Sequence, residues 1–200
     1  MKRIPILLVY LRLLLGLVIL VLAILQLAYA RNIIIALITI GLISDILDGI
    51  IARRLGISTE KLRRLDSAID QAFWIMILIG TCIISPAFYQ QHYIQLIAII
   101  ILECIAYIFS YVKFRKEVVT HAILSKIWTL SMFATIIQAI ATGNSGSLFH
   151  LCFYLGIITR LEIILILSLL HSWANDVPSL YHALQLRRVK DIKRSKWFNG

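Results

Sequence analysis

Charged residues are scarce in this chain of 200 residues: Asp, Glu, Lys and Arg make up only 15%, while 60% of the residues are hydrophobic. A soluble domain carries roughly a quarter charged residues and under half apolar ones. The deficit of charge excludes an ordinary soluble domain, because so much apolar surface needs a larger apolar surrounding than a protein core provides. The composition therefore predicts an integral membrane protein.

Cysteine and proline are also scarce, with three residues of each. Cys82, Cys104 and Cys152 lie far apart inside apolar segments, and neither CxxC nor Cys/His spacing is present. This excludes a typical zinc site and indicates three small buried hydrophobic side chains. Because the sequence contains no linker or low-complexity tract, we expect a single domain over residues 1–200.

The net charge of +10 could indicate a nucleic-acid partner. The basic residues, however, lie between and after the apolar runs, as in the cytoplasmic loops of membrane proteins, so we expect no nucleic-acid partner. The N-terminus superficially resembles a signal peptide. Its apolar stretch, residues 4–30, is too long for one and is interrupted by Arg12, which predicts a retained first helix.

Six apolar stretches are long enough to span a bilayer, which takes about 20 helical residues. A seventh segment, Asp176–Lys193, is shorter and amphipathic, and belongs to a basic C-terminal segment, residues 176–200; we expect it to lie along the membrane surface. The fold class predicted is an all-α membrane bundle of six transmembrane helices, over residues 4–30, 32–52, 65–87, 93–112, 123–140 and 148–170.

Basic residues alternate between the predicted connections. They are absent from Ser85–His92 and Thr142–Ser147, and the connection between the first two spans has only Arg31. The positive-inside rule therefore places both termini in the cytoplasm. The basic residues on that side are Arg53, Arg54, Lys61, Arg63 and Arg64, then Lys113, Arg115 and Lys116, and six more from Arg187 to Lys196.

Four carboxylates are predicted to lie at one membrane depth. Asp45 and Asp48 share a face near the end of the second helix, and Asp66 and Asp70 share a face at the start of the third. Acidic residues this close cannot all stay ionised at low dielectric without compensation. Mg²⁺ or Mn²⁺ would supply it, since hard cations prefer oxygen ligands. The alternative is a set of ion pairs with Arg53, Arg54, Arg63 and Arg64.

The segment around these acids reads Asp45-Ile-Leu-Asp48-Gly49-Ile-Ile-Ala52-Arg53 and, after twelve residues, Asp66-Ser-Ala-Ile-Asp70. It resembles the defining motif of the CDP-alcohol phosphotransferase family, DxxDGxxAR…GxxxDxxxD. Seven of the eight fixed positions match; Leu62 stands where the family has its second glycine. That leucine could crowd the nucleotide or leave activity intact in a repacked loop.

The resemblance implies a role for each matching residue. Asp45, Asp48, Asp66 and Asp70 would bind metal, with two ions expected, and Asp70 would be the catalytic general base. The CDP site would include Asp48, Gly49, Ala52 and Arg53. A bare glycine lets a base or phosphate approach the helix backbone, and an arginine fork suits a phosphate.

Two weaker matches extend the resemblance along the chain. The opening Ile4-Pro5-Ile6-Leu-Leu-Val9-Tyr-Leu-Arg12 is similar to the family's IPNxxTxxR stretch, with Pro5 and Arg12 retained. The sequence Ser125-Lys126-Ile-Trp-Thr129 resembles the GKxKT that opens helix five of phosphatidylglycerophosphate synthases. A homodimer is expected from the family alone.

Further charges interrupt the later spans: Glu103 in the fourth, and Arg160 and Glu162 in the sixth. Glu103 and Arg160 could form a buried ion pair. Alternatively, Lys126 and Arg160 could bind the phosphate of an acceptor, since charge-assisted bonds to phosphate favour Lys and Arg.

The resemblance implies a phospholipid-synthesising transferase. It would move a phosphatidyl group from a CDP-linked lipid, with CDP-diacylglycerol expected, to a small alcohol, and release CMP. We expect glycerol 3-phosphate as the acceptor, ahead of inositol phosphate or an uncharged alcohol. The expected location is the bacterial inner membrane, with the site facing the cytoplasm. A divalent-cation carrier and a catalytically silent interaction subunit are the alternatives.

Overall fold

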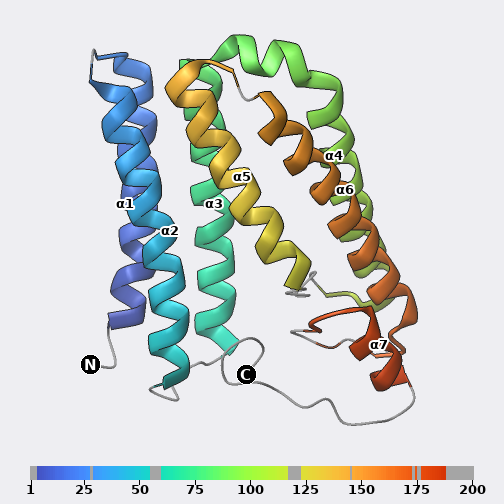
Figure 1. Cartoon of the computed structure of the whole chain (residues 1–200). Coiled ribbons are helices and arrows are strands. Elements are labelled where there is room, and N and C mark those ends of the chain that lie inside the picture. Colours follow the sequence, from blue (N-terminus) through green and yellow to red (C-terminus); the bar gives the residue numbers. More distant parts are fainter. Residues whose placement is uncertain are drawn as a thin grey trace. The chain divides into compact units, whose positions relative to one another are not determined.

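The computed structural model describes residues 4–27, 29–54, 60–116, 123–144, 146–172, 174 and 177–187; for residues 4, 5, 52–54 and 60–64 only the backbone is described. Within these residues the chain is helical and contains no strand (Figure 1). The helices are α1 (Ile4–Leu25), α2 (Ala30–Arg54), α3 (Glu60–Ile84), α4 (Pro86–Phe114), α5 (Ile123–Thr142), α6 (Gly146–Leu169) and α7 (Leu180–Arg187).

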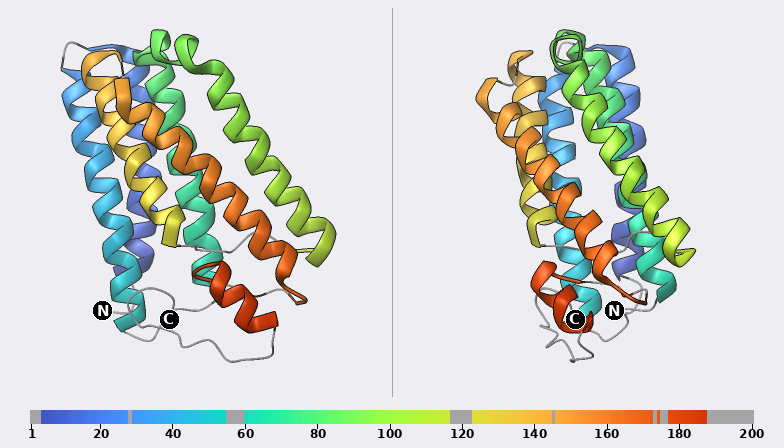
Figure 2. Two further views of the ribbon diagram at one scale, coloured as in Figure 1. Left: turned by 45° about the vertical axis from the view of Figure 1, so that its right-hand side comes forward. Right: turned by 90° about the vertical axis from the view of Figure 1, so that its right-hand side faces the viewer.

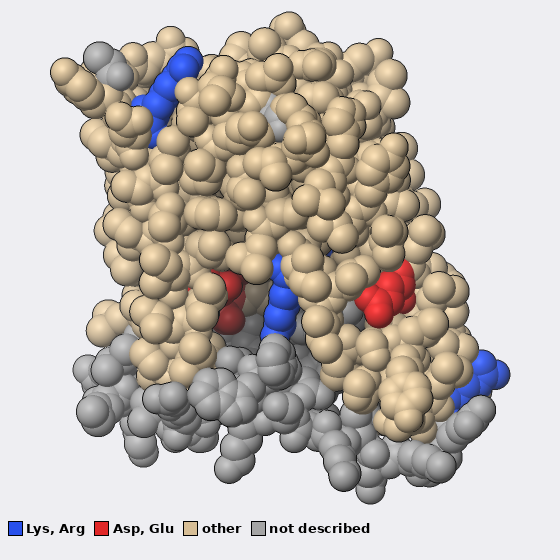
Figure 3. Space-filling view, in the orientation of Figure 1, with Lys and Arg blue, Asp and Glu red and all other residues tan. Residues whose placement is uncertain are grey.

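Helices α1 to α6 are each long and apolar enough to cross a membrane. The predicted fold class, a membrane bundle of six spanning helices, is therefore confirmed. The surface agrees with this fold class: among the described residues on the face shown in Figure 3, most atoms belong to neither acidic nor basic side chains. The exposed side chains of these helices are mainly Leu, Ile, Val and Tyr, which are suited to contact with lipid.

Several helix boundaries differ from those expected from the sequence, and two of them have a local cause. Helix α1 ends at Leu25, earlier than the predicted residue 30, because Gln26 adopts a left-handed backbone with φ of 48°. Residues 86–92 of the segment 85–92, predicted as a connection, form the first turns of α4. Pro86 opens that helix, where its fixed φ is favourable and its missing N–H costs nothing.

The chain divides into two compact units, and each is described separately. The first comprises residues 1–89 and 136–144, and the second comprises residues 90–135 and 145–200. The single domain expected over residues 1–200 stays a prediction.

In the first unit, α1 packs along both α2 and α3, whereas α2 and α3 meet at few points. The three helices stay adjacent in all views (Figures 1 and 2). The last part of α5 joins this unit, where the buried Ser85 hydroxyl donates a hydrogen bond of 2.8 Å to the carbonyl of Ala139.

A glycine layer brings these three helices close together. Phe73 of α3 is only 2% exposed, and its ring lies against Gly16 of α1 and Gly41 of α2. A Cβ at Gly41 would come within 2.2 Å of the ring, and one at Gly16 within 3.2 Å. A Cβ at Gly41 would therefore push α2 away from α3, whereas one at Gly16 would first meet the flexible end of Met76 on α3.

The second unit contains α4 from Gln90 onward, α5 up to Thr135, α6 and α7. The ammonium group of Lys113 donates to the carbonyls of Leu167 and Ser168 near the end of α6, at 2.9 and 2.8 Å. These carbonyls belong to the last turn of α6, where a lysine is favourable. Helix α7 packs on the same end of α6 through Ala183, which contributes to a buried cluster with Ile166, Leu170 and Val177. The described helix is shorter than the predicted surface segment, and residues 188–200 lie outside the described part.

Candidate metal and nucleotide site

The four aspartates of the motif converge in the first unit. Asp45 and Asp48 lie one turn apart on α2, and Asp66 and Asp70 one turn apart on α3. Because residues three or four apart share a helix face, each pair projects its carboxylates to one side. All four reach the same guanidinium group, that of Arg12 on α1.

Arg12 divides its two terminal nitrogens between the two helices. Nη1 donates to Asp45 Oδ1 at 2.5 Å and to Asp70 Oδ1 at 3.2 Å. Nη2 donates to Asp48 Oδ2 at 2.6 Å and also to Asp66 Oδ1. Each nitrogen therefore joins one carboxylate of α2 to one of α3. The planar guanidinium permits this bridging, which the single nitrogen of a lysine could not reproduce.

The cluster is closed on one side and open on the other. The side chain of Arg12 is fully buried, and that of Asp48 is 3% exposed. Asp45, Asp66 and Asp70 are between 36% and 38% exposed. A ligand can therefore reach three of the carboxylates without displacing Arg12 from its buried position.

The neighbouring residues hold the cluster in register. Ser44, next to Asp45, is buried and donates from its hydroxyl to the carbonyl of Leu8 at 3.3 Å, which links α2 to α1. The glycine layer lies one helical turn deeper: Gly16 follows Arg12 by four residues, and Phe73 follows Asp70 by three. Close packing in that layer brings Arg12 within reach of both aspartate-bearing helices.

The oxygen atoms are spaced suitably for a divalent cation. Asp45, Asp48 and Asp66 each offer one carboxylate oxygen, and these atoms lie within 4.8 Å of one another. Ligands on opposite sides of Mg²⁺ are about 4.2 Å apart, so small side-chain rotations would close the site. An all-carboxylate set is also the chemistry that Mg²⁺ and Mn²⁺ prefer. The residues present therefore fit such an ion.

The expected nucleotide residues follow the acidic cluster along α2. Gly49 is half-buried and directly follows Asp48. Ala52 and Arg53 belong to the last turn of α2, and their side chains lie outside the described residues. The same is true of Leu62 and of Arg54, Arg63 and Arg64, so the alternative ion pairs stay untested. Among the described residues, Arg12 is a partner that all four aspartates share.

The two expected acceptor-phosphate residues belong to the second unit. Lys126 is exposed in the first turn of α5. Arg160 of α6 is buried, forms an ion pair with Glu103 of α4, and lies over the ring of Trp128 with its Cζ 4.4 Å from the ring centroid. The ion pair between Glu103 and Arg160, one of the two alternatives, is confirmed.

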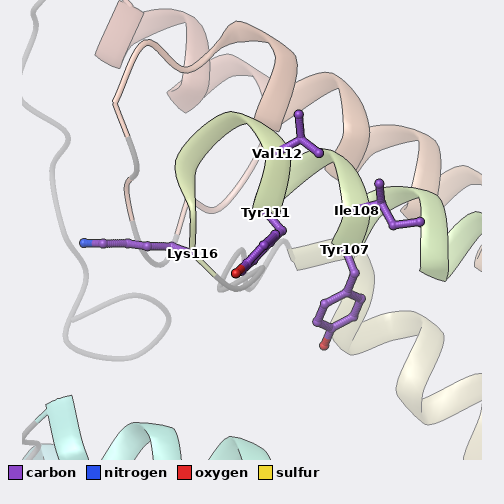
Figure 4. Close-up of a pocket in the computed structure, with 5 residues that line it drawn as sticks. All are labelled: Tyr107, Ile108, Tyr111, Val112 and Lys116. Atoms are coloured by element: carbon purple, nitrogen blue, oxygen red, sulfur yellow. The ribbon is translucent and has the colours of Figure 1, made fainter.

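A separate hollow lies at the end of α4 in the second unit. All its lining residues come from the last turns of this helix and the two residues after it (Figure 4). Tyr107 and Tyr111 point to one side of the helix, whereas Ile108 and Val112 point to the other. Among the described residues that line the hollow, Lys116 is the one charged side chain, and these residues offer no set of converging polar groups such as a substrate site needs.

Arg12 is the residue of the site whose role sequence reasoning missed. The sequence shows that Arg12 matches the arginine of the family's N-terminal stretch, but it does not indicate a partner for this residue. The available signal was a charge within a spanning helix, which is costly unless it is paired. Sequence spacing could not identify the partners, because they lie on two other helices.

Together, the spanning helices and the open-sided aspartate cluster define a membrane-embedded protein with a candidate divalent-cation site. The family model for CDP-alcohol phosphatidyltransferase matches residues 2–174, and the chain belongs to this family. Comparison with curated proteins and with solved structures gives no match. The family transfers a phosphatidyl group from a CDP-alcohol to an acceptor and uses divalent metals, which agrees with the acidic cluster.

Proposed function

We propose that this chain transfers the phosphatidyl group of CDP-diacylglycerol to glycerol 3-phosphate and releases CMP. The observation that carries this proposal is the convergence of the four motif aspartates on one cluster with an open side. Family membership supports the reaction type, and the substrates are our inference.

Asp45, Asp48, Asp66 and Asp70 would hold the metal, with two ions of Mg²⁺ or Mn²⁺ proposed. Bound divalent cations neutralise charge on a pyrophosphate and on the oxygens of a phosphoryl transfer. The buried Asp48 would anchor the ions from within the protein, whereas the other three carboxylates meet them at the open side.

Asp70 is proposed as the general base because it matches the last aspartate of the family motif, and its 36% exposure is compatible with contact to an acceptor. It would take the proton of the acceptor hydroxyl as that oxygen forms a bond to the phosphorus that carries the diacylglycerol. The bond from this phosphorus to the bridging oxygen of the pyrophosphate breaks, and CMP leaves with the bonding electrons. Asp70 then returns its proton to solvent.

The donor would lie across the membrane surface. The small residues Gly49 and Ala52 would let the cytidine or a phosphate approach α2 closely. Arg53 would pair with the phosphates of the donor, and Asp48 would also contribute to the nucleotide site. The acyl chains can stay in the bilayer, because the helices that carry these residues span it.

The proposal for the acceptor rests on Lys126. Its exposed ammonium group in the first turn of α5 can bind a phosphate. Arg160, which forms an ion pair with Glu103, remains the second candidate. This preference for a cationic contact is the reason to propose a phosphorylated acceptor rather than an uncharged alcohol.

A cation carrier fits the structure less well. Intramembrane transport sites are typical of interrupted helices near the bilayer midplane. Here α2 and α3 are continuous helices, and the aspartates lie toward the last part of α2 and the first part of α3.

A silent subunit is the remaining alternative, because Leu62 replaces a motif glycine. The Leu62→Gly substitution tests this alternative: CMP release by the variant but not by the unaltered chain would support a catalytically silent subunit. Turnover by the unaltered chain would exclude it.

We propose the bacterial inner membrane as the location, with both termini and the aspartate cluster on the cytoplasmic side. The alternation of basic connections supports this orientation. A green fluorescent protein fused to the C-terminus would fluoresce in cells, whereas fused alkaline phosphatase would stay inactive. The reverse pair of results would overturn the orientation.

The acceptor is tested by offering purified protein CDP-diacylglycerol with Mn²⁺ and, in separate reactions, glycerol 3-phosphate, inositol phosphate, inositol or serine. We expect a phosphatidyl product, identified by its mass, with glycerol 3-phosphate. A product formed with another alcohol alone would correct the acceptor, while Asp70→Asn protein controls for contaminating activity.

A further inference from the structure

We propose that Arg12 is the fixed countercharge of the aspartate cluster, and that it sets how tightly the cluster binds divalent cations. This inference rests on the metal site of the proposed function but concerns a residue to which no role is assigned there. It would make Arg12 a positioning residue that acts through the carboxylates.

The first argument is the position of Arg12. Arg12 belongs to α1, and its side chain is fully buried. It contacts one oxygen of each of the four aspartates. Its Nε is buried without a hydrogen-bond partner among the described residues. The cluster therefore provides the compensation for this buried cation, which would otherwise be strongly unfavourable.

The second argument is that the contacts leave room for metal. A carboxylate has two oxygens, so each aspartate can hold Arg12 through one and a cation through the other. Arg12 lies on the buried side, whereas Asp45, Asp66 and Asp70 are about one-third exposed on the other side. A cation can thus enter at the open side while Arg12 keeps its place.

The third argument is the charge balance. Arg12 contributes one positive charge to the cluster, so its neutralisation makes the cluster more negative by one unit at any given number of ionised carboxylates. Repulsion among them should open the metal-free cluster when Arg12 is neutralised, because charges at this separation interact strongly at low dielectric. The same loss of positive charge should increase attraction for a divalent cation.

The test uses the Arg12→Gln variant of the full chain in detergent, with Arg31→Gln as the matched control. Arg31 is an exposed residue in the first turn of α2, outside the aspartate cluster. In EDTA we expect the midpoint of thermal unfolding to fall by about 5 °C or more for Arg12→Gln, with most of the loss recovered in Mn²⁺. Mn²⁺ binding, followed by electron paramagnetic resonance, should tighten about tenfold. Arg31→Gln should change neither quantity.

A charge-compensated variant separates electrostatics from packing. In the unaltered chain, Asp45→Asn should lower the midpoint of thermal unfolding in EDTA, because the substitution removes a partner of Arg12. In the Arg12→Gln background the same change should raise it, because it relieves repulsion. This double variant also keeps the test decisive if Arg12→Gln alone fails to fold.

The inference would be overturned if Arg12→Gln lowered the midpoint of thermal unfolding equally in EDTA and in Mn²⁺ and left the Mn²⁺ affinity unchanged. Arg12 would then contribute to packing alone. The inference would also be overturned if Asp45→Asn lowered the midpoint both in the unaltered chain and in the Arg12→Gln variant. If unaltered protein binds Mn²⁺ and Arg12→Gln binds it equally well, only this inference fails. If the unaltered protein binds no Mn²⁺, the metal site of the proposed function fails with it.

Discussion

Gly41 of α2 lies so close to the ring of Phe73 of α3 that a Cβ at this position would come within 2.2 Å of the ring's Cζ. This contact is one helical turn from the aspartates, since Asp45 follows Gly41 by four residues and Asp70 precedes Phe73 by three. The packing of an apolar layer thus determines the spacing of the charged layer beside it.

We therefore expect Gly41→Ala to destabilise the protein by about 1–3 kcal/mol, the usual cost of overpacking a buried contact. The ring of Phe73 is large and only 2% exposed, so it cannot move aside easily. Mn²⁺ binding should weaken in the same variant, because α2 and α3, which carry the carboxylates, would move apart. Thermal unfolding and Mn²⁺ titration measure the two effects.

Two other glycines serve as controls for this prediction. A Cβ at Gly16 would mainly meet the flexible end of Met76, and a Cβ at Gly80 would be 3.3 Å from its nearest neighbour, Ile19 Cγ2. We expect Gly80→Ala to be tolerated and Gly16→Ala to cost less than Gly41→Ala. Equal losses at all three positions would contradict the role assigned to the contact with Phe73.

Asp70→Asn should lower kcat by about 100- to 10,000-fold, the range for loss of a general base. The KM for the CDP-linked donor should change much less, because the other three carboxylates remain. Steady-state CMP release gives both constants. A variant whose defect lies in KM with kcat preserved would assign Asp70 to binding and leave the reaction without its proposed base.

Lys126→Gln should raise the KM for glycerol 3-phosphate by about tenfold, because a charge-assisted contact to the phosphate is lost. The same change at Lys113 is a matched control: Lys113 donates to the carbonyls of Leu167 and Ser168, so its loss should affect stability instead. An unchanged acceptor KM in Lys126→Gln would direct the search to Arg160.

The ion pair between Glu103 and Arg160 should show strong energetic coupling. Arg160→Gln leaves a carboxylate without its cation inside a spanning helix, and we expect a loss of about 3 kcal/mol. The double change Glu103→Gln with Arg160→Gln should be less harmful than Arg160→Gln alone. Unfolding in detergent measures the stability of the two single variants and the double variant. If the stability losses of the single variants simply add up in the double variant, the ion pair makes no contribution to stability.

The sequence predicted the helices well, because an apolar run of about 20 residues in a bilayer has few alternatives to a helix. The exceptions are local. Pro86 looked like part of a connection but begins α4, and α1 ends at Leu25 although the following residues remain largely apolar. Backbone conformation at single residues decided both boundaries, and composition does not reveal it.

The convergence of the four aspartates was predictable from the sequence, but their arrangement around Arg12 was not. The spacing of the aspartates on α2 and α3 indicated that each pair shares a face. The connection to Arg12 depends on how α1 packs against both helices, and that packing depends in turn on Phe73 between two glycines. Such contacts join distant parts of the chain and leave no periodic pattern in the sequence.

The most direct test of the account is CMP release by purified protein in liposomes that contain CDP-diacylglycerol, with glycerol 3-phosphate and Mn²⁺. We predict release that requires the acceptor, stops in EDTA, returns when Mn²⁺ or Mg²⁺ is restored, and is lost in Asp70→Asn. Folded protein that releases no CMP with either metal, or whose release is unaffected by EDTA and by Asp70→Asn, would contradict a metal-dependent transferase centred on the aspartate cluster.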